Sequence, residues 1–309
     1  MYIGIDIGGT KCAVILADDR GQKLSRIPFE TSDADTTLTQ IFSVIEQLPA
    51  GRAIGISCGG PLDEARGLIL SPPNLPGWDN IPVVQMLTDQ FGIPAYLCND
   101  ANACALAEWK FGAGQGTQNM IFLTFGTGMG AGLILNGRLY SGTNGNAGEI
   151  GHMRLSDFGP VGYGKSGSFE GFCSGGGIKQ LGQALAREQL QCGKTTSFCR
   201  SYEELESITA KSLAEAAKNG DKIATRVWDI VSEKLGYGIS LLIDLLNPER
   251  IVIGSIYERS EQLLRDGLIR VVKRESLPQS YDACRIVPAA LGDEIGDYAA
   301  IAVAMKEGF

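Results

Sequence analysis

The chain has 309 residues, of which 44% are hydrophobic and 20% are charged, and its formal net charge is −8. This length allows two domains and a large buried core, and the composition is that of a globular protein. The acidic balance argues against binding to nucleic acid or to anionic membranes through general electrostatics.

The N-terminal part of the chain reads as three strands followed by alternating helices and strands. The expected strands cover residues 2–7, 12–17, 24–30, 53–57 and 95–98, and the expected helices cover 36–48, a segment that begins at Pro82, and 101–111. Three successive strands followed by such alternation indicate an α/β domain with a mixed sheet.

A glycine-rich stretch at residues 112–116 is the best candidate for a domain boundary. We therefore predict an N-terminal α/β domain over 1–115 and a larger α/β domain over 116–296. In the second domain we expect a new strand-turn-strand unit, few clear elements over 142–177, a long helix over 221–246 and a buried strand over 250–253. A C-terminal helix over about 297–309 is expected to pack back on the first domain.

The chain is expected to be cytoplasmic. Its first residues already read as a strand rather than as a signal peptide, and no apolar run is long enough to cross a bilayer. None of the eight cysteines forms a C-x-x-C pair, so buried free thiols in a reducing compartment are favoured over disulfides or a metal cluster.

A loose internal repeat links two glycine-rich turns. The segment Ile5-Asp6-Ile7-Gly8-Gly9-Thr10-Lys11 aligns with the region of Phe125-Gly126-Thr127-Gly128-Met129-Gly130, and each reads as strand, Gly/Thr turn and strand. Turns without bulky side chains let backbone N–H groups and a hydroxyl reach phosphate oxygens. One such turn is weak evidence because glycine turns also close ordinary hairpins. The pair predicts two half-molecules that hold one polyphosphate from opposite sides.

Two acidic positions are candidates for chemistry in the first half. Asp6 ends a strand immediately before the first glycine turn, where a carboxylate can face a metal-bound phosphate, although it can also be a simple capping residue. Asn99-Asp100 lies at a strand-to-helix junction, the edge of an open α/β sheet at which ligands bind. Aspartate is also a preferred N-cap residue, and an N-cap can serve as a base if its carboxylate faces a substrate hydroxyl.

The second half contains the only histidine. His152 lies three residues after Glu149 in a glycine-rich loop, and Glu170 follows. Together they could hold several hydroxyls of a polar ligand, although a lone histidine is more often structural. In the first half, the segment Asn74-Leu75-Pro76-Gly77-Trp78 is either a substrate-facing lip or a loop anchored by a buried tryptophan.

In order and spacing, four of these motifs resemble the ROK family of sugar kinases and sugar-responsive repressors. They are Ile5-Asp6-Ile7-Gly8-Gly9-Thr10-Lys11, Asn99-Asp100-Ala101-Asn102, Gly126-Thr127-Gly128-Met129-Gly130 and Gly148-Glu149-Ile150-Gly151-His152. The resemblance covers essentially the full chain. It implies a duplicated actin-like ATPase (ribonuclease H-like) fold with two domains and an interdomain cleft.

The resemblance also implies roles for individual residues. Asp100 is the expected general base, and Asp6 is expected to act indirectly on Mg²⁺. The expected sugar-binding residues are Gly60, Asn99, Asp100, Glu149, His152 and Glu170. The expected nucleotide-binding residues are Asp6, Gly8, Gly9, Thr10, Lys11, Gly126, Thr127, Gly128, Gly130 and Gly254. Ser255 stands where the adenosine-side motif usually has a second glycine.

One departure from the family pattern concerns zinc. The family commonly carries a C-x-C-G-x-x-G-C-x-E motif after the histidine, and here Val161, Tyr163 and Ser168 stand at the three cysteine positions. A structural zinc normally needs four ligands, usually Cys or His, and only His152 remains. We therefore predict no zinc site, and another partner must orient His152.

The expected function is ATP-dependent phosphorylation of a sugar hydroxyl, with Mg²⁺, most simply at the primary hydroxyl of an unmodified hexose. The expected partner is a small sugar, without nucleic acid or membrane, and family analogy suggests a homodimer. One alternative is a sugar-responsive regulator that does not phosphorylate; the acidic charge and the start of the chain at the first phosphate strand argue against a repressor. Another is a mechanical or chaperone ATPase, which would not explain Glu149, His152 and Glu170 together. The sequence does not identify the sugar.

Overall fold

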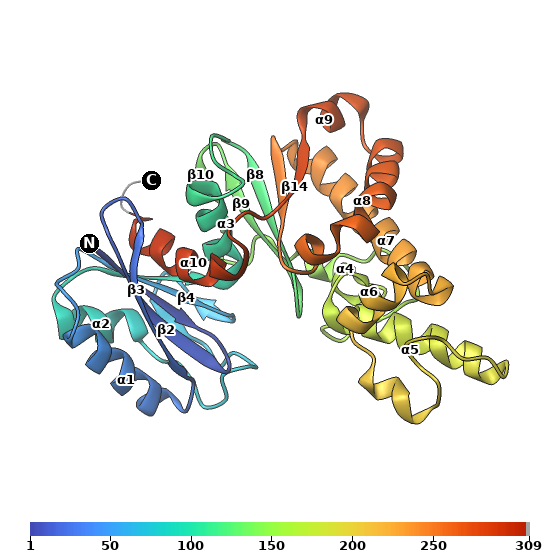
Figure 1. Cartoon of the computed structure of the whole chain (residues 1–309). Coiled ribbons are helices and arrows are strands. Elements are labelled where there is room, and N and C mark those ends of the chain that lie inside the picture. Colours follow the sequence, from blue (N-terminus) through green and yellow to red (C-terminus); the bar gives the residue numbers. More distant parts are fainter. Residues whose placement is uncertain (307–309) are drawn as a thin grey trace. The chain divides into compact units, whose positions relative to one another are not determined.

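The computed structural model describes residues 1–306, and contacts divide them into two compact units (Figure 1). Unit 1 comprises Met1–Phe122, Gly132–Ala147 and the stretch that starts at Ala290, whereas unit 2 comprises Leu123–Ala131 and Gly148–Ala289. A unit defined by contacts is not the same as an autonomously folding domain. The boundaries 1–115 and 116–296 therefore stay predictions.

The first sheet has the strand order β3-β2-β1-β4-β7. Its strands are β1 (Tyr2–Ile7), β2 (Lys11–Ala17), β3 (Lys23–Glu30), β4 (Ile54–Cys58) and β7 (Ala95–Asn99). The β1–β2 and β2–β3 pairs are antiparallel, and the β1–β4 and β4–β7 pairs are parallel. The mixed sheet expected from the sequence is confirmed, and its strands begin and end within one or two residues of the predicted limits.

Helices cover both faces of this sheet. They are α1 (Ala34–Glu46), α2 (Val83–Phe91), α3 (Asp100–Phe111) and α10 (Ile295–Ala304). Because side chains alternate along a strand, Ile3, Ile5 and Ile7 of β1 pack in the cluster that includes α1 and α2, whereas Ala13 and Ile15 of β2 pack against α10. A short hairpin, β5 (Leu62–Asp63) with β6 (Leu68–Ile69), lies between β4 and α2 in the chain.

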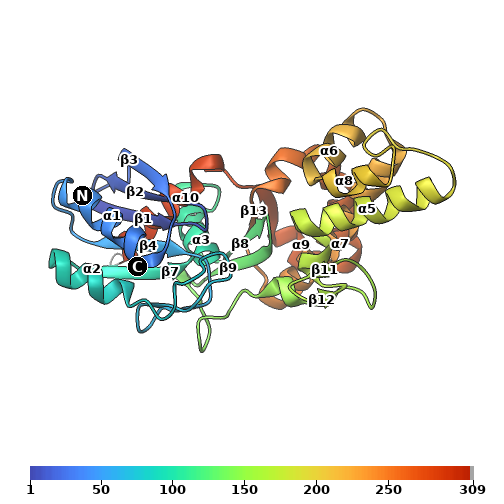
Figure 2. The same ribbon diagram turned by 90° about the horizontal axis from the view of Figure 1, so that it is seen from below.

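The C-terminal helix α10 packs directly on the N-terminal sheet, as both views show (Figures 1 and 2). A Cβ at Gly55 of β4 would lie 2.1 Å from the Ala304 nitrogen, so only glycine permits this approach of helix to strand. In the structure α10 packs on this sheet, and it starts two residues earlier than the predicted C-terminal helix. Residues 307–309 of the expected helix lie outside the described residues.

A buried carboxylate fastens the returning chain to the rest of unit 1. Glu108 of α3 is fully buried and accepts hydrogen bonds from the N–H groups of Ala113, Ala290 and Leu291, at 2.7 to 3.2 Å. Ala113 belongs to the glycine-rich stretch after α3, and Ala290 and Leu291 precede α10. The carboxylate therefore ties both segments to one helix.

Glu108→Ala should lower the free energy of unfolding by about 3 kcal/mol, because several N–H groups would lose their acceptor in a buried position. Urea denaturation followed by circular dichroism measures the effect. The exposed Glu188 of helix α5 (Gly175–Gln191) supplies the matched control, Glu188→Ala, for which we expect little change. Equal stability of the two variants would contradict a fastening role for Glu108.

A second sheet repeats the strand order of the first, β10-β9-β8-β13-β14. Its strands are β8 (Met120–Phe125), β9 (Met129–Leu135), β10 (Arg138–Leu139), β13 (Arg250–Ile253) and β14 (Arg285–Pro288). If the five strands of each sheet are numbered in chain order, both sheets read 3-2-1-4-5. This is the repeat that the two glycine turns indicated.

Unit 2 is built around the long helix α7 (Lys222–Leu246), which packs against α8 (Ile256–Glu275), α5 (Gly175–Gln191), α6 (Ala210–Lys218) and α4 (Phe169–Phe172). The predicted long helix and the strand β13 are confirmed. The other named elements of residues 1–306 are α9 (Pro278–Ala283), the hairpin strands β11 (Val161–Gly162) and β12 (Lys165–Ser166), and the 3₁₀ turns η1 (Ile150–His152), η2 (Glu203–Ser207) and, in unit 1, η3 (Gly292–Glu294). Within residues 1–306 no helix combines the length and the apolar character needed to span a membrane.

Candidate functional site

The first glycine turn joins β1 to β2 in unit 1. Its backbone is closed by a hydrogen bond from the Gly8 nitrogen to the Lys11 oxygen, 3.0 Å long, and Gly8 and Thr10 offer their carbonyls to Thr31. A Cβ at Gly9 would lie 2.6 Å from the backbone oxygen of Asn74. The side chains of Thr10 and Lys11 are exposed, so a hydroxyl and an ammonium group stand at the turn.

Asp6 precedes this turn on the face of β1 that packs against α10. Its carboxylate lies at the start of that helix, since a Cβ at Gly296 would be 2.7 Å from Asp6 Oδ2. Burial raises the pKa of Asp6 to about 6, and the negative charges of Asp297 and Asp100 add to the rise while Arg26 opposes it. A carboxylate in this setting gains from a nearby cation, which is the chemistry expected of a group that faces a metal-bound phosphate.

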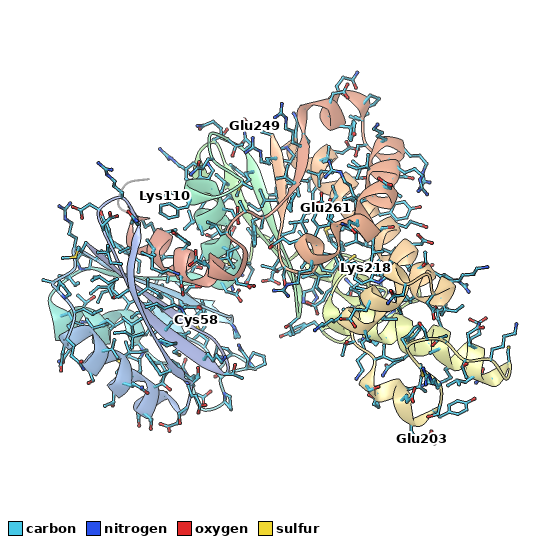
Figure 3. The ribbon with its side chains drawn as sticks, viewed as in Figure 1. Cys58, Lys110, Glu203, Lys218, Glu249 and Glu261 are labelled. Carbon is cyan, nitrogen blue, oxygen red and sulfur yellow. The ribbon has the colours of Figure 1, made fainter. Side chains whose placement is uncertain are left out.

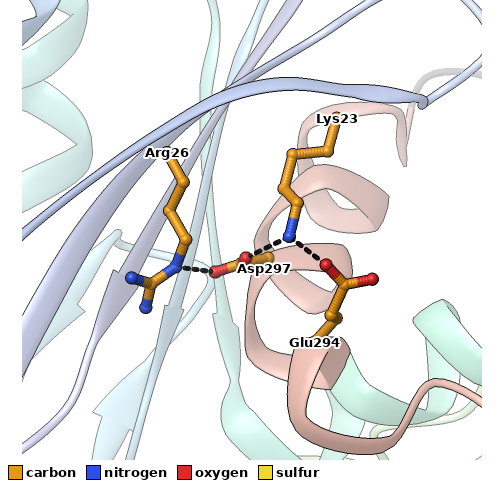
Figure 4. A network of polar contacts seen from close by, with 4 residues as sticks. All are labelled: Lys23, Arg26, Glu294 and Asp297. Carbon is orange, nitrogen blue, oxygen red and sulfur yellow. Dashed lines mark hydrogen bonds and ion pairs between the residues drawn. The ribbon is translucent and has the colours of Figure 1, made fainter.

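A charged network holds the start of α10 against β3 (Figure 4). Asp297 is 5% exposed and accepts hydrogen bonds from Lys23 Nζ and Arg26 Nε, each at 2.8 Å. Lys23 also pairs with Glu294. Asp297 was not expected as a site residue from its sequence, where its only signal is its place next to Gly296 at the start of the last helix.

Asn99 and Asp100 occupy the junction between β7 and α3. Asn99 is the N-cap of α3, and its Oδ1 accepts a hydrogen bond from the Ala101 nitrogen at 3.0 Å; Asp100 Oδ1 accepts from the same nitrogen at 2.8 Å. The Asn99 nitrogen donates to Glu64 Oε1 at 2.8 Å. Asp100 is exposed, so the capping role and an encounter with a substrate are compatible.

Three further positions surround this junction in unit 1. A Cβ at Gly59 would lie 3.7 Å from Asn74 Nδ2 and 3.8 Å from Asp100 Oδ2, and one at Gly60 would lie 3.4 Å from Asn99 Nδ2. Asn74 thus adjoins both Gly9 and the Asp100 region.

Of the two interpretations of the 74–78 segment, the anchored loop holds for Trp78. This side chain is fully buried, and its Nε1 donates to the Ser32 oxygen at 3.3 Å. Asn74 at the other end of the segment is exposed.

The second glycine turn joins β8 to β9 in unit 2. Thr124, the position that aligns with Asp6, accepts a hydrogen bond at its Oγ1 from the Gly130 nitrogen at 2.8 Å. The Gly126 nitrogen donates to the Gly128 oxygen, and the Gly126 oxygen accepts from Gly175 at the start of α5 at 2.8 Å. Thr127 at the tip is exposed.

Glu170 connects this turn with the loop that carries the histidine. Its Oε2 accepts from the Met129 nitrogen at 3.1 Å. The 3₁₀ turn Ile150–His152 approaches so closely that a Cβ at Gly151 would lie 2.2 Å from the Met129 oxygen. Glu149 and His152 are exposed on either side of that glycine. Unit 2 therefore gathers Glu170, His152 and the second turn around the backbone of β9.

The three residues at the cysteine positions of the zinc motif have structural roles in the β11–β12 hairpin and at the start of α4. Val161 pairs with Ser166 in the β11–β12 hairpin, Tyr163 lies in its loop, and the buried Ser168 caps α4 by accepting from the Gly171 nitrogen at 3.0 Å. Among residues 1–306 no group of three or more His, Cys, Asp or Glu side chains is arranged to hold a metal ion. The lack of zinc itself stays a prediction.

A pocket of about 690 Å³ opens in unit 2 beside the second turn. It is lined at one side by Gly175 and Gly176 and at the other by Ile256 and Arg259 of α8, and Lys218 of α6, labelled in Figure 3, also lines it. The segment between β13 and α8 leads to this pocket.

The segment between β13 and α8 consists of Gly254 and Ser255, and each has a distinctive backbone feature. The Gly254 nitrogen donates to the Leu123 oxygen at 3.0 Å. Ser255 has φ of +56°, a value that favours the glycine usual at this position.

The repeated sheet and the paired glycine turns define an actin-like ATPase fold of two domains. The ROK family model matches residues 2–307 of the chain. Glucokinase of Halalkalibacterium halodurans is 32% identical over 308 residues, covering 96% of this chain and 92% of that protein. The xylose repressor of Caldicellulosiruptor bescii is 29% identical over 99% of this chain and 78% of its own length. A ROK family glucokinase structure from Streptomyces griseus, in complex with glucose and AMPPNP, is 29% identical with a TM-score of 0.76 over 99% of both chains.

The chain therefore belongs to the ROK family. Glucokinases among its relatives support sugar phosphorylation, and the relatives also include sugar regulators.

Proposed function

We propose that this protein transfers the γ-phosphoryl group of ATP to a hydroxyl of a hexose, most simply the primary hydroxyl. The observation that carries the proposal is the exposed Asp100 carboxylate, which accepts a hydrogen bond from the Ala101 nitrogen and lies in the same unit as Asp6 and the first glycine turn. In such transfers positioning and charge stabilisation do most of the work.

Unit 1 supplies the base in this proposal. Asp100 accepts the proton of the sugar hydroxyl as that oxygen attacks the γ-phosphorus in line, while Asn99 binds a neighbouring hydroxyl. Mg²⁺ bound with ATP would neutralise phosphate charge. The partly buried Asp6 carboxylate suits a position near that ion, because it lacks a full solvation shell of its own. Thr10 and the Gly8 and Gly9 backbone contact phosphate oxygens, and Lys11 adds a positive charge.

Unit 2 supplies most of the sugar and nucleoside contacts. Glu149, His152 and Glu170 bind sugar hydroxyls, while Gly126, Thr127, Gly128 and Gly130 form the second phosphate turn. We assign the nucleoside to the pocket that Gly175, Gly176 and Ile256 line, next to Gly254.

A second candidate function is sugar-responsive regulation without phosphorylation. The observation in its favour is the similarity to a xylose repressor over nearly the whole chain. Such a protein would bind a sugar without releasing ADP from ATP. The exposed Asp100 favours the kinase, since a binder does not need a base.

An ADP-release assay over a panel of hexoses and N-acetylated hexosamines separates the candidates. The kinase should release ADP with at least one sugar, far faster than without sugar, and EDTA should abolish the release because the metal is needed for phosphoryl transfer. Binding of a sugar by calorimetry without any ADP release would instead support the regulator. ATP hydrolysis that ignores every added sugar would favour an ATPase of another kind.

A further inference from the structure

The loop of the β11–β12 hairpin places an aromatic ring against the only histidine of the chain. The ring centroids of Tyr163 and His152 are 5.1 Å apart, and the ring planes are 83° apart. This edge-to-face geometry is the favourable one for aromatic pairs. Both residues belong to unit 2, and Figure 2 shows the hairpin strands β11 and β12.

The backbone at Tyr163 is unfavourable for a bulky residue. Tyr163 has φ of +45° and Gly164 has φ of +74°, so the hairpin closes through a two-residue loop with both residues in the left-handed region. Glycine, asparagine and aspartate are the residues that favour the first of these positions. Moreover, the Tyr163 side chain is 74% exposed, so burial does not compensate for the unfavourable backbone. The unfavourable backbone of this tyrosine, with no burial to offset it, indicates that the ring has a functional role.

The hairpin is firmly connected to the segment that carries His152. The Phe169 nitrogen donates to the Met153 oxygen at 2.8 Å, and the Leu155 nitrogen donates to the Gly167 oxygen at 2.9 Å. Lys165 Nζ donates to the His152 oxygen. The backbone that carries Tyr163 is therefore tied to the histidine segment by several hydrogen bonds.

The outer strand of the hairpin is also held in place. The side-chain amide of Gln180 on α5 both donates to and accepts from the Val161 backbone, each hydrogen bond being 2.9 Å long. The base of the loop is thus fixed to a long helix. A Tyr163 ring carried by this anchored hairpin can restrict the rotamers of the His152 side chain.

We propose that Tyr163 is a positioning residue that orients the His152 imidazole for sugar binding. The inference rests on the proposed function, since it assumes that His152 contacts the sugar. Tyr163 would act through the ring contact alone, without touching the sugar. The Tyr163 hydroxyl then has no part in the role, and the ring is what matters.

The test uses two substitutions at one position. Tyr163→Phe retains the ring, whereas Tyr163→Gly removes the ring and suits the left-handed backbone, so the hairpin should fold at least as well. In Tyr163→Gly we expect the KM for the hexose to rise by about threefold to tenfold, the range that corresponds to the energy of one aromatic pair. The KM for ATP should not change, and Tyr163→Phe should behave like the unsubstituted protein. Tyr202→Ala, another exposed tyrosine of unit 2, is the control.

The same variants have a spectroscopic readout that does not depend on turnover. Because the chain has one histidine, its imidazole carbon-bound protons give unambiguous NMR signals. Without sugar, Tyr163→Gly should shift these signals by loss of the ring current, and Tyr163→Phe should not. Unchanged signals in Tyr163→Gly would overturn the inference, and so would an unchanged hexose KM.

Titration with D-glucose and the other hexoses of the panel distinguishes a failure of the proposed sugar site from a failure of the role of Tyr163. If the His152 signals of the unsubstituted protein respond to no sugar, the proposed sugar site fails and the inference fails with it. If they respond equally, and at equal sugar concentration, in Tyr163→Gly, only the inference fails. A weaker response in Tyr163→Gly that Tyr163→Phe restores supports both.

Discussion

Asp100→Asn should reduce kcat by about 10²- to 10⁴-fold, the usual contribution of a positioned general base. The substitution removes the basic carboxylate but keeps an oxygen that can accept the hydrogen bond from the Ala101 nitrogen. Asn99 caps the same helix, so the start of α3 should retain its structure. The loss should therefore be chemical rather than structural.

The measurements are steady-state ADP release and, separately, sugar affinity by calorimetry. We expect the Kd for the sugar to stay close to that of the unsubstituted protein while kcat falls. Asp35→Asn is a matched control, because Asp35 is likewise an exposed aspartate in the first turn of a helix. Turnover that survives in Asp100→Asn would exclude this residue as the base.

Asp6→Asn should abolish most turnover and yet stabilise the fold at neutral pH. Removal of a preorganised charge from a site of charge development costs about 10²-fold or more in kcat. Stability moves the other way because burial and the charge of Asp297 raise the pKa of Asp6 to about 6. Since an aspartate has a pKa near 3.9 in an unfolded chain, the ionised form of Asp6 costs up to about 3 kcal/mol in the folded state.

The sign of the pH dependence follows from this shift. Between about pH 4 and pH 6 the folded state binds a proton at Asp6 that the unfolded state has lost, so the stability of the unsubstituted protein falls as the pH rises through this window. The penalty is absent below the window and complete above it. The amide introduced by the substitution does not titrate, so the advantage of Asp6→Asn should be near zero at pH 4 and greatest at pH 7 and above.

Urea denaturation of both proteins at pH 4, 5, 6 and 7.5 measures this difference, with Asp35→Asn again as the control. A variant that is less stable than the unsubstituted protein at pH 7.5 would mean that the interactions of Asp6 in the folded state outweigh its burial. A variant that retains full turnover would remove Asp6 from the proposed mechanism.

The sequence by itself determined the features that depend on local chemistry. Gly8 and Gly126 mark the two glycine turns, and the apolar runs beside these turns indicated the strands that flank them. Asn99-Asp100 was recognisable because an N-cap pair at a strand-to-helix junction has a local hydrogen-bonding pattern. These signals were enough to predict a mixed α/β sheet and two phosphate-binding turns, and their order along the chain carried the resemblance to the ROK family, which implied the duplicated fold.

Only the tertiary structure decided which distant residues share an environment. Asp297 comes close to Asp6 because α10 returns to the N-terminal sheet, where Gly55 permits its approach, and Tyr163 meets His152 because backbone hydrogen bonds connect the hairpin to the histidine segment. Trp78, which the sequence left open between a lip and an anchor, is buried beneath its loop. The physical reason is that periodicity and capping report contacts within a few residues, whereas burial and the pairing of charges or rings depend on how the whole chain folds.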